Sequence, residues 1–312
     1  MARLKIADNL DGEPQTAEEL AVKTHTNAPL LFRLLRALAG LGLVRADEEK
    51  RFHLTPLGRT MRTKGDGAFG DFMEMFLGDQ FLPWTKYVDA IRTGKTQFDQ
   101  LYGVPYYEHL KKNPDERGRF VNGLKQMTKI FNANITDYYD FTPFKHIVDI
   151  AGSDGTFLIN ILKNVPHARG TVFDEEPSIE AAKKNVLDYP NVKDRLDFVA
   201  GSFFTDPIPA GGDCYTMKSA LDFEDELAIQ ILKNIRNKMK SGTKFLVIQT
   251  VVPDTDEFHI GKLFDQYLFM LTGGKERTKA EAEHVLRGTG FELNRIIPTT
   301  YPLWDILEAT AV

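Results

Sequence analysis

The hydrophobic pattern of this chain changes its period close to residue 143. Before that point, apolar side chains recur about three and four positions apart, which is typical of amphipathic helices. After it, short apolar runs alternate with helical patterns, which is typical of buried strands joined by helices. A chain of 312 residues is also longer than a single compact core usually organises. We therefore predict two domains, a helical one followed by an α/β one.

The first helices are predicted from Thr16, which is followed by Glu19 at the spacing of a capping box. Leucines then mark one face of a second helix: Leu30, Leu31, Leu34, Leu35, Leu38 and Leu41. Gly40 and Gly42 end this helix, and LVRADEEKRFHLT adds two short runs around a charged turn. Helix, helix and hairpin form a winged-helix pattern. So apolar a second helix is better suited to packing against a partner than to reading DNA.

Seven strand-like runs follow in the second half. They are HIVDIAG (146–152), GTVFDEE (170–176), LDFVAGSFF (196–204), DCYTMKS (213–219), KFLVIQTVV (244–252), FELNRIIP (291–298) and LWDILEAT (303–310). Helical patterns separate most of them, which predicts parallel crossovers and a doubly wound sheet. Only TTYP joins the last two, and so short a link holds no crossover helix. These two runs are expected as an antiparallel hairpin at the sheet edge, as in a methyltransferase-type sheet.

Composition and charge narrow the possible functions. The chain is 42% hydrophobic and 27% charged, and no apolar run approaches the ~20 residues that cross a membrane. Its first residues lack the signal-peptide pattern, so we expect a cytoplasmic location. A net charge of −5 gives no general attraction to nucleic acid. The single cysteine, Cys214, excludes an internal disulfide and a cysteine-rich metal site, and no metal is expected.

A glycine turn follows the first predicted strand, in IVDIAGSDGTF. Gly152 and Gly155 allow the backbone to approach a ligand at the carboxyl end of the strand. Asp174 follows at roughly the ~20-residue distance at which an acid binds a ribose, although it can equally cap the next helix. Neither GxGxxG nor GxxxxGK[ST] is present. A nucleoside without a pyrophosphate therefore fits better than a dinucleotide or a triphosphate.

Several segments, in this order, resemble the S-adenosylmethionine-dependent O-methyltransferases of the plant and bacterial small-molecule type: LLFRLLRALAGLGLV, FDQLYGVPYYEHL, VDIAGSDGTF, FDEEP, GSFFTDPIPAGGD, KSALDFEDE and LTGGKERT. The resemblance covers nearly the whole chain. It implies an α/β fold in which an α-helical winged-helix dimerisation domain (1–95) and a helical linker to the substrate pocket (96–143) precede a methyltransferase-type Rossmann domain (144–312). It further implies a homodimer that methylates a hydroxyl of a small aromatic or polyketide-like molecule.

The same resemblance assigns residues to the site. The donor, S-adenosylmethionine, is expected at Asp149, Gly152, Gly155, Asp174, Ser202, Phe203 and Lys218. The substrate pocket is expected to include Met127, Phe131, Tyr267 and Met270, with Glu276 near the reacting centre.

Three features depart from the family pattern outside the catalytic loop. Ala151 replaces a glycine of the turn, and its Cβ is expected to crowd the donor slightly. Ser202 replaces an aspartate at the adenine, which reduces one contact by ~1 kcal/mol. Members also carry a further helix before ARLKIADNL, so the usual dimer seam is expected to be incomplete.

The most important departure lies in KSALDFEDE. The family has Lys, three residues, His, Asp and Trp, and the His is the general base. Here Lys218 is followed after three residues by Asp222 and Phe223. Either Asp222 occupies the base position, or the His is deleted and Asp222 matches the residue after it. Asp222 can also simply cap the next helix.

Two acids flank the family's His, and their places hold Gln249 and Glu276. Methyl transfer can survive, because burial raises the pKa of a carboxyl and a general base supplies only about 10² to 10⁴ in rate. Alternatively, the donor serves as a fixed positive charge for a hydroxylation, decarboxylation, elimination or cyclisation. A third hypothesis is a winged-helix regulator that senses a metabolite, which the acidic charge disfavours.

Overall fold

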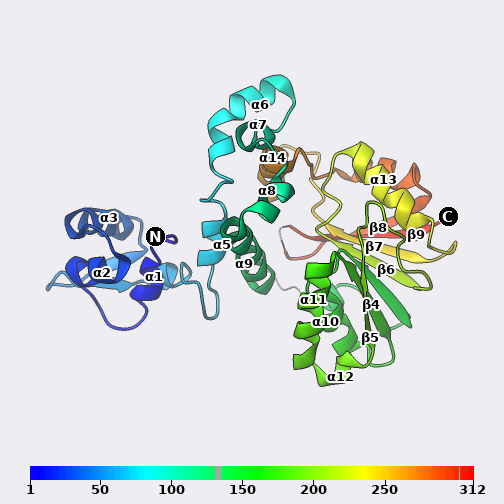
Figure 1. Cartoon of the computed structure of the whole chain (residues 1–312), viewed down its shortest axis with the longest axis horizontal. Coiled ribbons are helices and arrows are strands. Elements are labelled where there is room, and N and C mark those ends of the chain that lie inside the picture. The colour runs from blue at the N-terminus through cyan, green and yellow to red at the C-terminus, as the bar shows by residue number, and fades with distance from the viewer. Residues whose placement is uncertain (131–134, 302) are drawn as a thin grey trace. The chain divides into compact units, whose positions relative to one another are not determined.

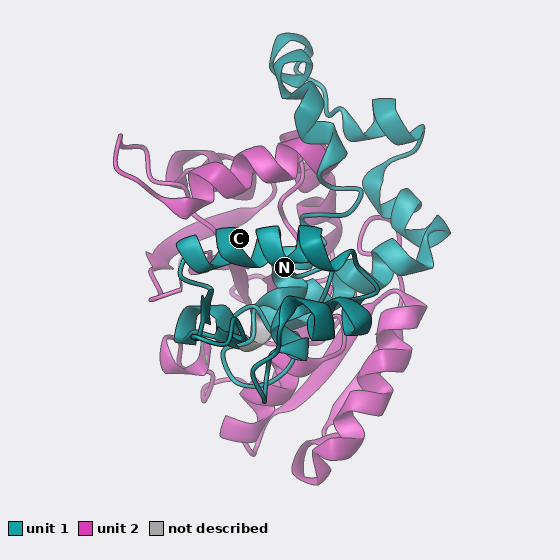
Figure 2. Cartoon of the chain, turned by 90° about the vertical axis from the view of Figure 1, so that its left-hand side faces the viewer, with its two compact units in different colours: residues 1–132 teal, residues 133–312 magenta. Residues whose placement is uncertain are grey.

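The computed structural model describes residues 1–130, 135–301 and 303–312 (Figure 1). The chain forms two compact units, residues 1–132 and 133–312, which Figure 2 colours separately. Two units agree with the two domains that the change of period predicts. The finer domain boundaries at residues 95 and 143 stay a prediction.

The first unit begins with the winged-helix pattern. Helices α1 (Ile6–Asn9), α2 (Ala17–Thr24) and α3 (Ala28–Gly40) precede an antiparallel hairpin of β1 (Val44–Ala46) and β2 (Phe52–Leu54). The predicted capping box is confirmed, since the backbone N–H of Glu19 donates to Thr16 Oγ1 at 3.2 Å and the Glu19 carboxylate accepts from the Thr16 N–H at 2.9 Å.

The single leucine face predicted for α3 is wrong at both ends. Leu31, Leu35 and Leu38 are buried in the core of the winged-helix part, whereas Leu30 is 60% exposed and Leu41 is 69% exposed. Leu30 lies one position from the buried stripe in the first turn, and Leu41 is the residue after the helix ends. Both leucines leave an apolar surface on this part of the unit.

The rest of the first unit is helical, as the pattern predicts. Its elements are α4 (Pro56–Arg59), α5 (Gly70–Met75), η1 (Leu82–Lys86), α6 (Tyr87–Thr93), α7 (Phe98–Tyr102), α8 (Tyr106–Lys112) and α9 (Pro114–Ile130). Helices α5 and α9 pack closely, because a Cβ on Gly123 would lie 2.8 Å from the Cβ of Met75. Phe98 and Tyr106 are buried in an aromatic cluster, where they pack edge to face.

The second unit contains a seven-stranded sheet in the order β5-β4-β3-β6-β7-β9-β8. The strands are β3 (His146–Ile150), β4 (Arg169–Asp174), β5 (Leu196–Ala200), β6 (Cys214–Lys218), β7 (Lys244–Gln249), β8 (Phe291–Ile297) and β9 (Asp305–Ala311). All seven predicted runs are therefore strands. The first five are parallel, and β8 and β9 form the predicted antiparallel edge. The strand order reverses at β3, where open α/β sheets bind ligands beyond the carboxyl ends.

Helices cover both faces of this sheet (Figure 1). The helices of this unit are η2 (Ile135–Asp137), α10 (Thr156–Asn164), α11 (Glu176–Asn185), η3 (Val186–Asp188), α12 (Pro190–Lys193), α13 (Asp225–Arg236), α14 (Ile260–Thr272) and α15 (Lys279–Arg287). Tyr215, Phe245 and Phe291 are fully buried with apolar side chains of α13 and α15. Each large side chain buried in this way contributes about 1.5–3 kcal/mol. No helix in the described part of the chain is long and apolar enough to span a membrane.

Candidate active site

The glycine turn between β3 and α10 has an unusual backbone. Ala151, Ser153 and Gly155 all have positive φ values, of 57°, 52° and 74°. A left-handed conformation costs roughly 1–2 kcal/mol for a residue other than glycine. The backbone alone is therefore a reason for the family's glycine at position 151. At Gly152 the reason for glycine is different: a Cβ there would lie 2.8 Å from Asp149 Oδ2.

Asp149 lies beneath this turn, on β3, and is buried. Its Oδ1 accepts a hydrogen bond from Thr216 Oγ1 at 2.7 Å. Its Oδ2 is buried and has no hydrogen-bond partner among the described residues. Burial raises the pKa of Asp149 to about 7. A buried acceptor without a partner is unfavourable by about 1–3 kcal/mol, so the site favours a ligand that donates a hydrogen bond here.

Asp174 ends β4 and ties this strand to the glycine turn. Its Oδ2 accepts from the backbone N–H of Ser153 at 2.8 Å, and its Oδ1 accepts from the N–H of Glu175 at 2.6 Å. The N-cap of α11 is Glu175, so the alternative that Asp174 caps this helix is wrong. Burial raises the pKa of Asp174. The Ser178 side chain also hydrogen-bonds this carboxylate, which keeps acceptor capacity for a ribose hydroxyl.

Lys218 ends β6, with its ammonium over an aromatic ring. Lys218 Nζ lies 3.8 Å from the ring centre of Trp304, and Trp304 Nε1 donates to Ser219 Oγ at 2.8 Å. Burial lowers the pKa of Lys218 to about 8, and the negative charges of Asp149 and Asp154 oppose this shift. No motif in the sequence singles out Trp304, because its ring reaches Lys218 only through the sheet pairing.

The loop after β5 carries Ser202 and Phe203. The Ser202 N–H donates to Asp206 Oδ2 at 2.8 Å, and Asn234 of α13 holds the carbonyl of Phe203 at 3.0 Å. The Phe203 ring lies 6.4 Å from the ring of Phe223. Phe203 therefore lies close to the loop that carries Asp222.

Asp222 lies in the loop between β6 and α13. The N-cap of α13 is Glu224, so the alternative that Asp222 caps this helix is wrong. Burial raises the pKa of Asp222 to about 6, and the positive charge of Arg277 opposes this shift. An acid with this pKa is mostly ionised at neutral pH and is a stronger base than an ordinary carboxylate.

Glu276 faces the same region from the LTGGKERT segment. Gln249, at the end of β7, donates through Nε2 to Glu276 Oε2 at 2.7 Å, and the Glu276 N–H donates to Asp265 Oδ1 at 2.9 Å. Burial raises the pKa of Glu276 to about 8, and the negative charge of Asp222 adds to this shift. As the pH rises, Asp222 should therefore ionise before Glu276 does.

The two carboxyl groups belong to loops that touch directly. The Lys275 N–H donates to the carbonyl of Asp222 at 3.0 Å. A Cβ on Gly274 would lie only 2.0 Å from this carbonyl oxygen, so the second glycine of LTGGKERT permits the contact. The two loops therefore lie side by side, and the placement of Glu276 near the reacting centre stays a prediction.

The predicted substrate residues are only partly accounted for. Tyr267 and Met270 lie on α14 and are buried in the second unit. Met127 is buried in the first unit, on α9, and Phe131 lies outside the described residues. This pocket stays a prediction. His146 begins β3, and His259 caps α14 by accepting from the Gly261 N–H, so both have structural roles.

The strand order with its antiparallel edge, together with the turn over Asp149, defines a methyltransferase-type Rossmann domain. Residues 84–292 match the family model of the O-methyltransferase domain. Residues 1–64 match that of the O-methyltransferase dimerisation domain, which supports a homodimer. The chain therefore belongs to the O-methyltransferase family.

Similar proteins extend along the whole chain. The phenazine O-methyltransferase of Lysobacter antibioticus is 35% identical over 312 residues, which cover 100% of this chain and 91% of that protein. The O-demethylpuromycin O-methyltransferase of Streptomyces alboniger is 32% identical over 317 residues, covering 99% and 84%. The crystal structure of an O-methyltransferase from neocarzinostatin biosynthesis, in complex with S-adenosylmethionine and 2-hydroxy-5-methyl naphthoic acid, is 30% identical, has a TM-score of 0.88, and matches over 100% of this chain and 94% of that one.

Proposed function

We propose that this protein transfers the methyl group of S-adenosylmethionine to a hydroxyl of a small aromatic or polyketide-like molecule. Family membership and the aromatic compounds in the names of similar proteins support this function. The observation that carries the donor assignment is the buried Oδ2 of Asp149, which lacks a partner among the described residues and lies beneath a turn that has no room for a Cβ at Gly152.

The residues around this turn suit the donor. Asp149 Oδ2 would accept from its ammonium group, Asp174 from its ribose hydroxyls, and Lys218 would face its carboxylate. Ser202 and Phe203 would border the adenine, with Gly152 and Gly155 allowing close approach of the backbone. When bound, S-adenosylmethionine supplies a methyl group attached to a positively charged sulfur.

Asp222 and Glu276 would handle the proton of the acceptor. Asp222, ionised at neutral pH, accepts this proton as the general base. Glu276, which holds its own proton, donates a hydrogen bond at the reacting centre and keeps a second negative charge out of it. An ordinary phenol has a pKa of about 10, so a base of this strength suits hydroxyls that a neighbouring carbonyl group makes more acidic.

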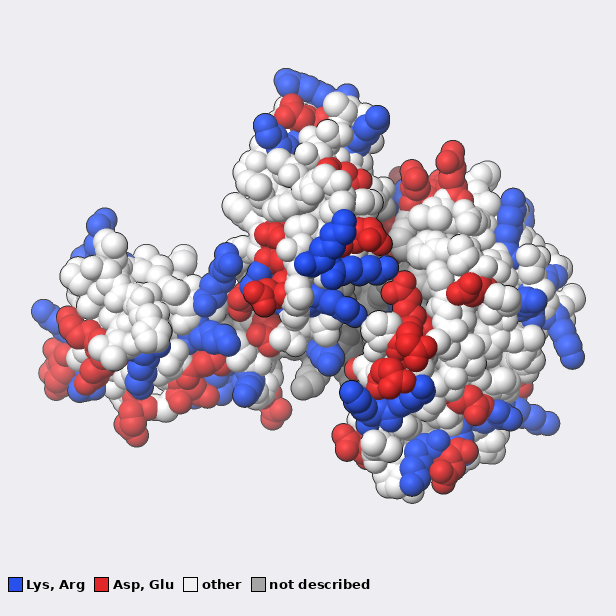
Figure 3. Space-filling model, viewed as in Figure 1, with Lys and Arg blue, Asp and Glu red and all other residues white. Residues whose placement is uncertain are grey.

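Non-methylating chemistry is the second candidate. The feature that favours it is Gln249, a neutral amide in the place of an acid, beside a loop that lacks the family's His. The regulator hypothesis has less support. In the view of Figure 3, the winged-helix part at the left carries basic and acidic side chains side by side, rather than one continuous basic face. We also propose a cytoplasmic location, which cell fractionation tests.

Calorimetry with S-adenosylhomocysteine tests the donor site. Gly152→Ala should abolish measurable binding, since its Cβ would crowd Asp149 Oδ2 at 2.8 Å. Gly118→Ala is the matched control, because a Cβ at this helical glycine meets nothing within 4 Å, and it should bind like the wild type. Absence of binding to the folded wild-type protein, or equal binding by both variants, would contradict the donor assignment.

A further inference from the structure

Three successive backbone carbonyls around Asp222 are held by one short segment. Arg277 Nη1 donates to the carbonyl of Leu221 at 2.7 Å, and Arg277 Nη2 donates to that of Phe223 at 2.5 Å. The carbonyl between them, of Asp222 itself, accepts from the Lys275 N–H at 3.0 Å. The residues on either side of Glu276, Lys275 and Arg277, thus bind the backbone of the loop that carries Asp222.

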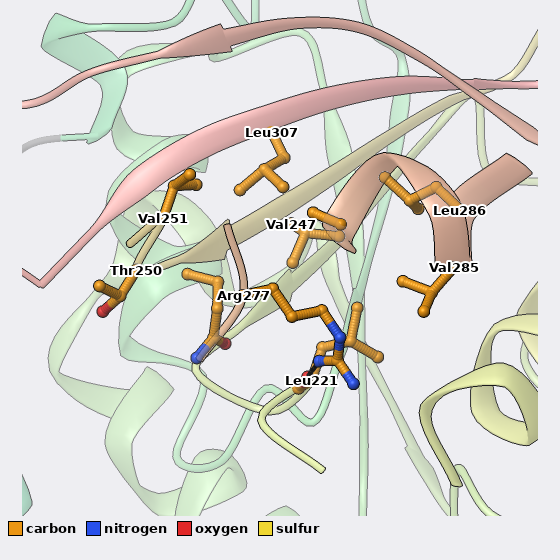
Figure 4. Close-up of a pocket in the computed structure, with 10 residues that line it drawn as sticks. Leu221, Val247, Thr250, Val251, Arg277, Val285, Leu286 and Leu307 are labelled. Carbon is orange, nitrogen blue, oxygen red and sulfur yellow. Dashed lines mark hydrogen bonds between the residues drawn. The ribbon is translucent and has the colours of Figure 1, made fainter. Parts of the chain in front are cut away.

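Arg277 is itself fixed in place. Its side chain is only 7% exposed, and its carbonyl accepts from the N–H of Val252, just beyond β7, at 2.9 Å. Figure 4 shows its guanidinium beside Leu221, at a small cavity lined mainly by apolar side chains such as Val247 and Leu307. The cavity volume of about 20 Å³ leaves room for roughly one water molecule. The N–H groups of the guanidinium therefore need hydrogen-bond acceptors within the protein. The carbonyls that flank Asp222 are two of these acceptors.

Asp225 pairs with this buried cation. Asp225 Oδ1 accepts from Arg277 Nε at 3.1 Å and from Nη2 at 2.9 Å, and its side chain is 43% exposed. Two further charged groups in the described part of the chain belong to these segments: Lys275 contacts Asp225 and Glu281, and Asp265 accepts from the Glu276 N–H. The charge of Arg277 also lowers the pKa of Asp222, against the effect of burial.

We propose that Arg277 is the positioning residue of the general base: it fixes the backbone on both sides of Asp222 and supplies the positive charge that Asp222 faces. This inference rests on the proposed role of Asp222 as base. The Arg277 side chain would then determine both the position of the Asp222 carboxyl and the pH at which it ionises. Asp225, which partly neutralises Arg277, would act on Asp222 in the opposite direction.

The pH dependence of kcat separates this role from simple structural support. In the wild type, the rate should rise with pH as Asp222 ionises, and Asp222→Asn should remove this rise. Arg277→Met removes the cation, so the midpoint should move to higher pH by about one unit. Its kcat should fall about tenfold or more, because the base is also displaced. Asp225→Asn removes the anion, so the midpoint should move to lower pH.

Arg236→Met is the matched control. Arg236 clamps backbone carbonyls in the same way, donating to Gly290 at 3.0 Å and Met239 at 2.9 Å, but it lies at the far end of α13. This variant should lose thermal stability and keep the wild-type midpoint.

Hydrogen exchange of the ligand-free protein gives a readout that does not depend on turnover. The peptide 271–278 should exchange faster in Arg277→Met than in the wild type, because the Lys275 N–H loses its fixed acceptor. Unchanged exchange would overturn the proposal, as would midpoints that move in the same direction in Arg277→Met and Asp225→Asn. If Arg277→Met does not fold, the pH–rate midpoint of Asp225→Asn is the test: a shift to lower pH supports the proposal, and no shift or a shift to higher pH overturns it. A rise with pH that survives in Asp222→Asn would remove the base role itself, and this inference with it.

Discussion

Replacing Glu276 by glutamine should stabilise the protein at pH 8 and change its stability little at pH 5. Glu276 is 5% exposed, and its pKa is raised from the usual 4.5 to about 8 by burial, with the charge of Asp222 as the second cause. Between the unfolded pKa of 4.5 and the folded pKa of about 8, the native state therefore binds more protons at this site than the unfolded chain does. The stability that the neutral carboxyl provides is complete below the unfolded pKa and is lost as the pH rises through the folded pKa.

The size of the effect follows from the shift. A shift of one pKa unit corresponds to about 1.4 kcal/mol, so the free energy of unfolding of the wild type should fall by about 3–4 kcal/mol at this site between pH 5 and pH 8. An amide is neutral at both pH values and can still pair with Gln249. Since each kcal/mol shifts Tm by about 2–4 °C in a domain of this size, Glu276→Gln should gain about 7–14 °C over the wild type at pH 8 relative to pH 5.

Thermal unfolding of both proteins at the two pH values measures this difference directly. Glu226→Gln is the control, because Glu226 is exposed on α13 and should show no such dependence on pH. An equal difference in Tm at pH 5 and pH 8, or a less stable Glu276→Gln variant at pH 8, would refute the claim that Glu276 is kept neutral by its surroundings.

Three further variants test other parts of the site. Gly274→Ala places a Cβ 2.0 Å from the Asp222 carbonyl oxygen, so it should destabilise the protein by about 1–3 kcal/mol and lower kcat more than donor affinity. Gly288→Ala is the control, because the nearest atom to its Cβ is 3.4 Å away, and it should have neither effect. Trp304→Leu removes the ring beneath Lys218 and should weaken S-adenosylhomocysteine binding by about 1–2 kcal/mol in calorimetry, whereas Trp304→Phe should recover most of it, and equal affinities would argue against the contact. Thr216→Val leaves Asp149 Oδ1 unpaired as well, and a Tm like that of the wild type would contradict the expected loss of about 1–3 kcal/mol.

The sheet was predictable because parallel strands buried on both faces appear in the sequence as short continuous apolar runs. Its edge followed from a link too short for a helix. The sequence shows the glycines at 152 and 274 but not why these positions need glycine. Each makes room for a group on another segment, Asp149 Oδ2 and the Asp222 carbonyl respectively. The apolar pattern of a helix does not mark where its buried face begins and ends, so it includes Leu30 and Leu41, which lie just outside the buried stripe.

The parts of the site that the sequence could not supply depend on tertiary contacts. Arg277 holds the carbonyl of Leu221 across 56 positions, and Trp304 reaches Ser219 across 85. No periodicity or motif spacing links such pairs. The two helix-cap alternatives, for Asp174 and Asp222, could be decided only when the caps were seen at Glu175 and Glu224.

We propose that this chain transfers a methyl group although the family's His is absent, with Asp222 as the base. The most direct measurement follows S-adenosylhomocysteine release and acceptor loss in the same reaction, with hydroxylated aromatic acceptors, for the wild type and for Asp222→Asn. We predict equal amounts of both in the wild type, and in the variant a kcat lowered by about 10² to 10⁴ with unchanged donor affinity. Acceptor loss without S-adenosylhomocysteine release would show that the bound donor acts only as a fixed charge, and a fully active Asp222→Asn variant would show that this carboxylate is not the base.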